Sequence, residues 1–305
     1  MIAAVCLTVA VSGLFYLVSG IDLAVAHLFF EPGSGFPASR IEALNSFRTF
    51  ASNVSLTLPL VLVVTLALKL AYPSKPSLLP PRLSLFFIAL FLAGPALLVN
   101  GILKPFWGRP RPINVVDFGG PWVFEKPWVI GMQGLGNHSF SSGEAATTAC
   151  LLPLILFVPR EWRWQIGAPL AIFVAAVSLN RIAFGAHFLS DVVISIGLML
   201  VLAAVLRHLF FVRYREVLSD AALEERLTAL GLRMADDRAA FGRRLGESFA
   251  RVRDAISRRG AAPRAAGEPS LTDLADAADR PSSPSSSASP GGAAVALGHA
   301  APNGS

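Results

Sequence analysis

The sequence contains little cysteine and little charge, and both shortages exclude classes of protein. Only 2 of its 305 residues are cysteine, and both lie within apolar runs, where cysteine is usually a small packing residue. The sequence contains no CxxC or HExxH spacing, so neither a disulfide framework nor a metal or other cofactor is predicted. Charged residues make up 15% of the chain, whereas a soluble domain has about a quarter. A soluble globular protein is therefore not expected.

Long apolar runs account for the missing charge. Hydrophobic residues make up 53% of the chain, and a helix of roughly 20 apolar residues spans the hydrocarbon of a bilayer. Four runs approach or reach this length. Two shorter runs become long enough only if their polar ends are counted, and polar ends are tolerated within a membrane where they line a water-filled cavity. We therefore expect an all-α polytopic membrane protein with a six-helix bundle. Its helices would be Ile2–Val18, Val54–Ala71, Leu83–Leu103, Ala145–Val158, Ile166–Leu179 and Val192–Leu206.

The first apolar run is expected to remain a membrane helix rather than a cleaved signal peptide. No Lys or Arg precedes it, although Ala24-Val25-Ala26 resembles a cleavage site.

Basic residues predict the orientation of the bundle. The connection between the second and third helices carries Lys69, Lys75 and Arg82 without any acid, and Arg207 and Arg213 follow the last helix. Basic connections stay in the cytoplasm, so both termini are expected there. The connections between helices three and four, and between five and six, then face outward. The formal net charge of +6 comes largely from cytoplasmic arginines, and no nucleic acid partner is expected.

The composition divides the chain into three parts. Residues 1–214 form the membrane domain, and residues 215–259 are predicted to be a basic amphipathic cytoplasmic helix. This helix would contact either the anionic membrane surface or a partner helix. Residues 260–305 are rich in Ala, Pro, Ser and Gly and are predicted to be disordered. The apolar face of the helix consists of Phe241, Leu245, Phe249, Val252 and Ile256.

Polar side chains gather at the outward ends of three helices. The third helix ends in LKPFWGRPRP, where Lys104 and Arg111 lie seven residues apart. An outward-facing loop has no need of basic residues as a membrane anchor. The interleaved prolines stiffen the segment, and rigid Lys and Arg groups suit a phosphate.

The fourth helix begins within NHSFSSGEAA, a stretch with unusual polarity for a membrane segment. A helix N-terminus binds anions through its free N–H groups, Gly143 allows close approach, and the Ser142 hydroxyl can donate to a phosphate oxygen. Ser141 and Glu144 also have the spacing of a capping box. The two interpretations are compatible.

The fifth helix ends in NRIAFGAHFLSD, in which His187 follows Arg181 by six residues and Asp191 follows His187 by four. If the sixth helix begins near His187, the histidine and the aspartate lie at positions i and i+4. A carboxylate bonded to one imidazole nitrogen would leave the other nitrogen free to attack.

These three segments resemble the type 2 phosphatidic acid phosphatase superfamily, whose signature is K-x6-RP, PSGH and SR-x5-H-x3-D. The resemblance covers roughly residues 1–212. Glu144 stands where the family has histidine, Ser141 where it has proline, and Asn180 where it has serine. The matching residues are Lys104, Arg111, Pro112, Ser142, Gly143, Arg181, His187 and Asp191.

The resemblance implies a metal-independent phosphatase that acts on lipid-linked phosphates. His187 would be the nucleophile that forms a phosphohistidine, and Asp191 would orient it. Glu144 replaces the histidine that protonates the leaving oxygen in the family. Whether Glu144 or His138 supplies that proton, or no acid is needed, stays open. The phosphoryl oxygens would be held by Lys104, Arg111, Arg181, Ser142 and Gly143.

Within the superfamily, the stretches WGRPRP and HSFSSGEAA are most similar to bacterial lipid A phosphatases. This implies hydrolysis of a phosphomonoester or diphosphate of lipid A, or of a similar lipid, at the periplasmic face of a bacterial inner membrane. The expected partners are therefore a lipid substrate and the membrane. Undecaprenyl diphosphate or phosphatidylglycerophosphate phosphatase, lipid-to-lipid phosphotransferase and an inactive lipid-binding homologue remain alternatives.

Overall fold

The computed structural model describes residues 1–131 and 138–260. Within these residues the chain is helical, and the only β-type pairings are two isolated bridges. The chain divides into two compact units, Met1–Phe241 and a second one that begins at Gly242, and each is described by itself.

Four helical stretches of the described residues are long and apolar enough to cross a membrane, which agrees with a helical membrane protein. A fifth arises if α1 (Ile2–Leu17) and α2 (Gly20–His27), bent by 81°, are counted as one span. The predicted count of six is not reached by these criteria. The four stretches are α3 (Glu42–Ala71), α4 (Pro81–Phe91) with η2 (Leu92–Leu103) and α5 (Lys104–Phe106), η6 (Arg160–Trp162) with α7 (Arg163–Ala183), and α8 (Leu189–His208) with η7 (Leu209–Arg213).

The segment predicted as the fourth membrane helix is shorter and interrupted. It consists of α6 (Gly143–Ala149) and a 3₁₀ segment, η5 (Leu152–Phe157). Pro153 lacks a backbone N–H and cannot continue the α-helical hydrogen bonding, so the α-helix ends before it. The remaining short helices are η1 (Pro37–Arg40), η3 (Pro112–Asn114) and η4 (Val116–Phe118).

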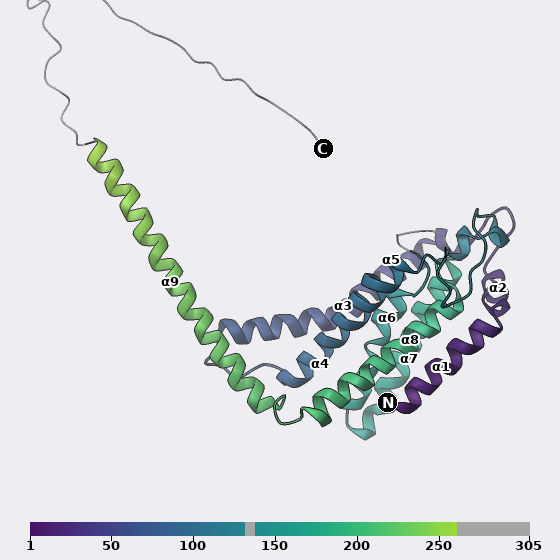
Figure 1. Ribbon diagram of the computed structural model, residues 1–305, viewed down its shortest axis with the longest axis horizontal. Coiled ribbons are helices and arrows are strands. Elements are labelled where there is room, and N and C mark those ends of the chain that lie inside the picture. The colour runs from purple at the N-terminus through teal and green to yellow at the C-terminus, as the bar shows by residue number, and fades with distance from the viewer. Residues whose placement is uncertain (132–137, 261–305) are drawn as a thin grey trace, which may run out of the picture. The chain divides into compact units, whose positions relative to one another are not determined.

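Helix α6 packs against α3, α7, α8 and η2, while α1 runs along α8 (Figure 1). The buried positions of α6 include Ala145, Ala146 and Ala149, and small residues allow helices in a membrane to approach closely. Deeper in the bundle lies a core that includes Phe86, Phe87, Leu90, Val99 and Met199. The start of α6 is therefore held from several sides.

The stretch that leads to Lys104 is a π-helix, η2, with Pro95 inside it. Proline and π-type turns free backbone carbonyls from their usual partners. Nδ2 of Asn100 donates to the carbonyl oxygen of Pro95 at 2.7 Å and so satisfies one of them. The helix continues without a stop, and Lys104 lies at its outer end.

Helix α9 spans Asp220–Gly260, so the helix predicted for 215–259 begins five residues later than expected. Its first part belongs to the first unit, where Glu224 accepts hydrogen bonds from the backbone N–H of Ser77 at 3.0 Å and pairs with Lys69 at 2.8 Å. Phe249 and Ile256 of the predicted apolar face are exposed. Residues 261–305 of the predicted tail lie outside the described residues.

Candidate functional site

His187 lies in the short turn between α7 and α8 and is only 3% exposed. The turn needs Gly185, whose φ of +63° lies in the left-handed region that favours glycine. The carbonyl oxygen of Gly185 accepts a hydrogen bond from Ile113 N at 3.1 Å, which ties this turn to the segment after Arg111. The histidine is thus presented by a packed turn.

Nδ1 of His187 lies 2.7 Å from the carbonyl oxygen of Ser139. A carbonyl only accepts, so this contact places the proton on Nδ1 and leaves the lone pair on Nε2. Burial lowers the pKa of His187 well below its ordinary value, and the charges of Lys104 and Arg181 lower it further. The ring is therefore neutral near pH 7, with Nε2 available as a nucleophile.

Asp191 does not bond directly to the ring, which differs from the arrangement expected from the spacing. Its Oδ2 is 3.9 Å from Nδ1 of His187, beyond hydrogen-bond distance. Helix α8 begins at Leu189, so the histidine precedes the helix and does not share its face. Oδ2 instead accepts from the Ser139 hydroxyl at 2.5 Å and from the backbone N–H of Phe188 at 2.8 Å. Asp191 therefore holds the two segments that flank the imidazole.

Behind Asp191 lies a fully buried ion network around Arg109, which sequence reasoning missed. The guanidinium of Arg109 donates to Asp191 Oδ1, to Asp22 Oδ2 at 2.8 Å and to Ser190 Oγ at 2.8 Å. Asp22 also accepts from the backbone N–H of Ser190 at 2.8 Å. An acidic side chain in an apolar helix normally has a charged or hydrogen-bonding partner. This rule was the signal in the sequence that could have identified Asp22.

The predicted phosphate-binding cations converge on the same region. Lys104, Arg181 and Arg111 all act electrostatically on His187. Arg181 is 6% exposed, its Nε lies 3.3 Å from Glu144 Oε2 as an ion pair, and its Nη1 has no hydrogen-bond partner among the described residues. Buried guanidinium donors without partners are costly, and a bound anion would satisfy them.

The start of α6 completes the region, with one correction to the predicted cap. Ser142, not Ser141, is the N-cap residue, and its Oγ accepts from Ala145 N at 3.4 Å. The expected capping box of Ser141 and Glu144 is therefore wrong. Gly143 is so close to Lys104 and Asn100 that a Cβ atom there would lie 2.7 Å from Asn100 Oδ1. A larger residue at this position would require the Asn100 side chain to move.

Glu144 turns away from the helix start and pairs with two arginines. Its Oε1 accepts from Arg48 Nε at 2.9 Å and lies 2.8 Å from Arg48 Nη2. Its Oε2 lies 3.3 Å from Arg181 Nε. Such an arrangement suits a carboxylate anion. Arg48, on the first turns of α3, was not identified from the sequence because it lies 96 residues from its partner.

His138, the other candidate acid, is 8% exposed and precedes Ser139. The described residues contain no cluster of three or more His, Cys, Asp or Glu side chains that could hold a metal ion. Of the two cysteines, Cys6 is exposed and Cys150 is buried.

Comparison with known proteins gives consistent matches. The family model described as "PAP2 superfamily" matches residues 83–215. A lipid A 4'-phosphatase of Rhizobium leguminosarum is 36% identical over 215 residues, which cover 65% of this chain and 91% of that protein. Lipid A 4'-phosphatases of Rhizobium etli and Francisella tularensis subsp. novicida are 43% and 40% identical. These two matches cover 38% and 37% of this chain, and 45% and 51% of those relatives.

Among solved structures, a transmembrane PAP2 type phosphatidylglycerolphosphate phosphatase from Bacillus subtilis matches with a TM-score of 0.45 and 18% sequence identity. The match covers 68% of this chain and 94% of that one.

Replacement of Arg109 by Met should strongly destabilise the fold. The change leaves Asp22 and Asp191 as buried, uncompensated carboxylates, at a cost of about 3–5 kcal/mol. We expect a clearly lower midpoint of thermal unfolding in detergent, and a partial recovery when Asp22→Asn is added. Arg207→Met, an exposed arginine of α8, is the matched control. An Arg109→Met protein that unfolds at the control's temperature would contradict the network's role.

Proposed function

The chain belongs to the PAP2 superfamily and is a membrane lipid phosphatase of that type, and on this premise we propose that it removes a phosphate from lipid A or a similar lipid. The proposal of lipid A rests on the relatives reported above, each of which is named a lipid A 4'-phosphatase. The observation that carries the chemistry is the neutral, buried imidazole of His187, fixed by Ser139 and surrounded by cations.

In the proposed reaction, Nε2 of His187 attacks phosphorus while the bond to the lipid oxygen breaks. Lys104, Arg111 and Arg181 compensate the charge on the phosphoryl oxygens, and the Ser142 hydroxyl and the Gly143 N–H donate to the same oxygens. The leaving lipid oxygen takes up a proton from water at the open side of the site. A water molecule then attacks the phosphohistidine, which releases inorganic phosphate and restores the neutral imidazole.

We assign Glu144 a positioning role in place of the expected acid role. Its two oxygens are engaged by Arg48 and Arg181, so the carboxylate orients Arg181 toward the phosphate. It also offsets part of the positive charge that the cations concentrate there. Asp191 likewise acts through Ser139 and the backbone of Phe188.

We further propose that six segments cross a bacterial inner membrane, with α1–α2 and α6–η5 counted as spans. Arg48 and Lys69 lie near opposite ends of α3, and Lys69 pairs with Glu224, which follows the last span. Basic connections stay in the cytoplasm, so the Lys69 end faces the cytoplasm and the Arg48 end faces the periplasm. The active site would then open to the periplasm.

Release of free phosphate from lipid A by the purified protein tests the proposed function. In detergent with EDTA we expect steady release by the wild type and a loss of at least about a thousandfold in His187→Ala. His208→Ala, an exposed histidine at the end of α8, is the matched control and should keep its activity.

Other outcomes of this assay would contradict the proposed mechanism or the proposed hydrolase activity. Release that persists in His187→Ala, or that EDTA abolishes, would contradict the mechanism. Transfer of phosphate to a second lipid without free phosphate would replace the hydrolase with a phosphotransferase.

The pH dependence of kcat/KM should reflect the lowered pKa of His187. Because the neutral ring attacks, activity is retained as pH falls until the pKa of His187 is reached. This pKa lies below the ordinary value of 6.5, so kcat/KM should stay flat from pH 7.5 down through 6.5. The profile should be measured on two substrates with different phosphate pKa values, because a limb that moves with the substrate belongs to the substrate. An enzyme-derived half-maximum at or above pH 6.5 would contradict the assignment.

A further inference from the structure

Arg48 is an exposed arginine that reaches the candidate site from outside the three motif segments. It lies on the first turns of α3, and α3 packs against α6 and α7. One turn before it, the carbonyl oxygen of Leu44 accepts a hydrogen bond from Nδ2 of Asn180 at 3.2 Å. Asn180 directly precedes Arg181 in α7. The start of α3 is therefore attached beside the phosphate-binding arginine.

Arg48 holds one oxygen of Glu144 more closely than Arg181 holds the other. Nε and Nη2 of Arg48 lie 2.9 and 2.8 Å from Oε1 of Glu144. Oε2 lies 3.3 Å from Nε of Arg181, as an ion pair that does not form a hydrogen bond. Nη1 of Arg181 has no hydrogen-bond partner among the described residues. The inner arginine therefore keeps donors for an anion, while the outer one is engaged by the carboxylate.

Glu144 is itself an anion that could satisfy those donors. It stands where the family signature has histidine, so this chain carries a negative charge at the edge of its phosphate site. That charge acts electrostatically on all three cations assigned to the phosphate, which are Lys104, Arg111 and Arg181. Carboxylates and phosphates bind the same guanidinium donors. A Glu144 side chain that turned inward would therefore compete with the substrate.

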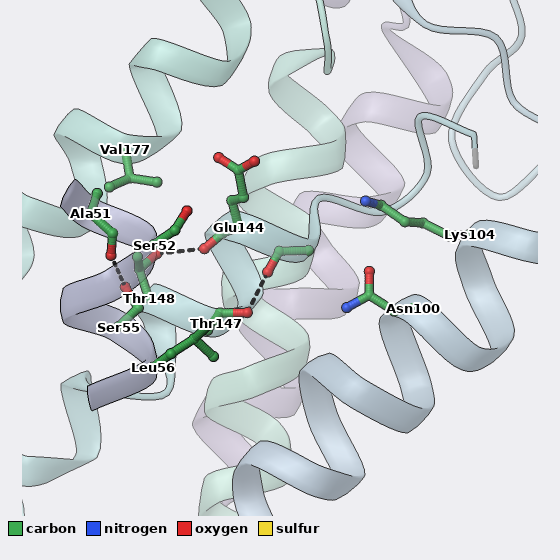
Figure 2. Close-up of a pocket in the computed structure, with 11 residues that line it drawn as sticks. Ala51, Ser52, Ser55, Leu56, Asn100, Lys104, Glu144, Thr147, Thr148 and Val177 are labelled. Atoms are coloured by element: carbon green, nitrogen blue, oxygen red, sulfur yellow. Dashed lines mark hydrogen bonds between the residues drawn. The ribbon is translucent and has the colours of Figure 1, made fainter. Parts of the chain in front are cut away.

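The structure leaves room for such a turn. Glu144 and Lys104 line the same cavity, which has a volume of about 280 Å³. In Figure 2 the Glu144 carboxylate lies apart from the Lys104 ammonium. A glutamate side chain moves its carboxylate by changing between staggered rotamers, and no backbone movement is needed. Packing does not bar this movement, so the outward position of the carboxylate depends on Arg48.

An ordinary surface ion pair is the alternative explanation of the contact. Exposed ion pairs contribute little to stability, and the side chain of Arg48 is 45% exposed. However, the charge of Arg48 also acts on Arg111 and Arg181. A further cation beside this cluster is unfavourable unless it serves an anion, and Glu144 is the anion that Arg48 contacts. The effect of the pair is therefore expected in the phosphate site rather than in stability.

We propose that Arg48 is a positioning residue that keeps the Glu144 carboxylate out of the phosphate site. This inference rests on the proposed function and concerns the occupancy of the same site. With Arg48 present, Glu144 orients Arg181 from outside and leaves its remaining donors to the phosphate. Without Arg48, the carboxylate turns inward as an internal competitor. Such a competitor reduces the fraction of enzyme that is open to substrate, so it raises KM and leaves kcat at saturation unchanged.

Arg48→Met tests the inference, because it removes the charge and the donors and keeps an unbranched apolar side chain. The purified variants are assayed on lipid A in mixed micelles, with inorganic phosphate as a competitive inhibitor. If the carboxylate fills the site in about nine-tenths of the molecules, KM and the inhibition constant of phosphate both rise about tenfold. We expect kcat to stay within about twofold of the wild-type value.

A double-mutant cycle identifies Glu144 as the competitor. Glu144→Gln replaces the carboxylate by a neutral amide, which does not compete for the cations in the same way. When Arg48→Met is added to Glu144→Gln, KM should change less than about twofold. A direct contact between Arg48 and the substrate, or a simple loss of surface charge, would instead raise KM equally in both backgrounds.

Two further variants serve as controls. Arg48→Lys keeps a positive donor and should restore KM to near the wild-type value. Arg40→Met is the matched control, since Arg40 is an exposed arginine just before α3 whose Nη2 donates to the carbonyl oxygen of Ser34 at 2.7 Å. It removes the same charge from the same end of α3 and should leave KM unchanged.

The outcomes separate the inference from the function beneath it. A rise in KM that persists in the Glu144→Gln background, or a loss of kcat without a change in KM, would overturn the role of Arg48 and leave the phosphatase intact. A wild type that releases no phosphate from lipid A would contradict the proposed function instead. Calorimetric binding of inorganic phosphate would then decide the inference, since Arg48→Met should weaken it about tenfold and an unchanged affinity would overturn it.

Discussion

The buried guanidinium of Arg109 is the interaction on which the candidate site depends. It pairs with Asp22 from α2 and with Asp191 from α8, and all three side chains are fully buried. Removal of any one of these buried charges would strongly destabilise the protein. The cluster therefore holds α2, α8 and the segment that contains Arg109 together. A chain of hydrogen bonds leads from this cluster to His187. Asp191 fixes the Ser139 hydroxyl and the Phe188 amide, and the Ser139 carbonyl fixes the ring of His187.

The outer half of the site has the opposite character, since its cations are only partly neutralised. Glu144 pairs with Arg48 and with Nε of Arg181, yet Nη1 of Arg181 has no hydrogen-bond partner among the described residues. The inner network is satisfied and rigid, whereas the outer cluster has donors to spare for an anion. A neutral nucleophile thus faces a positively charged pocket, an arrangement that suits phosphoryl transfer.

The motif spacing predicted which residues would meet, because the three segments share one end of the helical bundle. Lys104, Arg111, Arg181 and His187 come together as expected. The spacing selected Arg111 for the phosphate site but gave Arg109 no role, because the burial of Arg109 cannot be read from the sequence.

Other features depended on contacts that are remote in sequence. Asp22 and Arg109 are 87 residues apart, and Arg48 and Glu144 are 96 apart. Ser142 rather than Ser141 caps α6, a one-residue choice that the local sequence leaves open.

The covalent intermediate on His187 is the central claim. It is tested most directly by rapidly quenching the enzyme during turnover of a ³²P-labelled lipid and mapping the label. We predict an acid-labile label on the peptide that contains His187 and none in His187→Ala. A label on any other residue, or turnover without a labelled enzyme, would contradict the account.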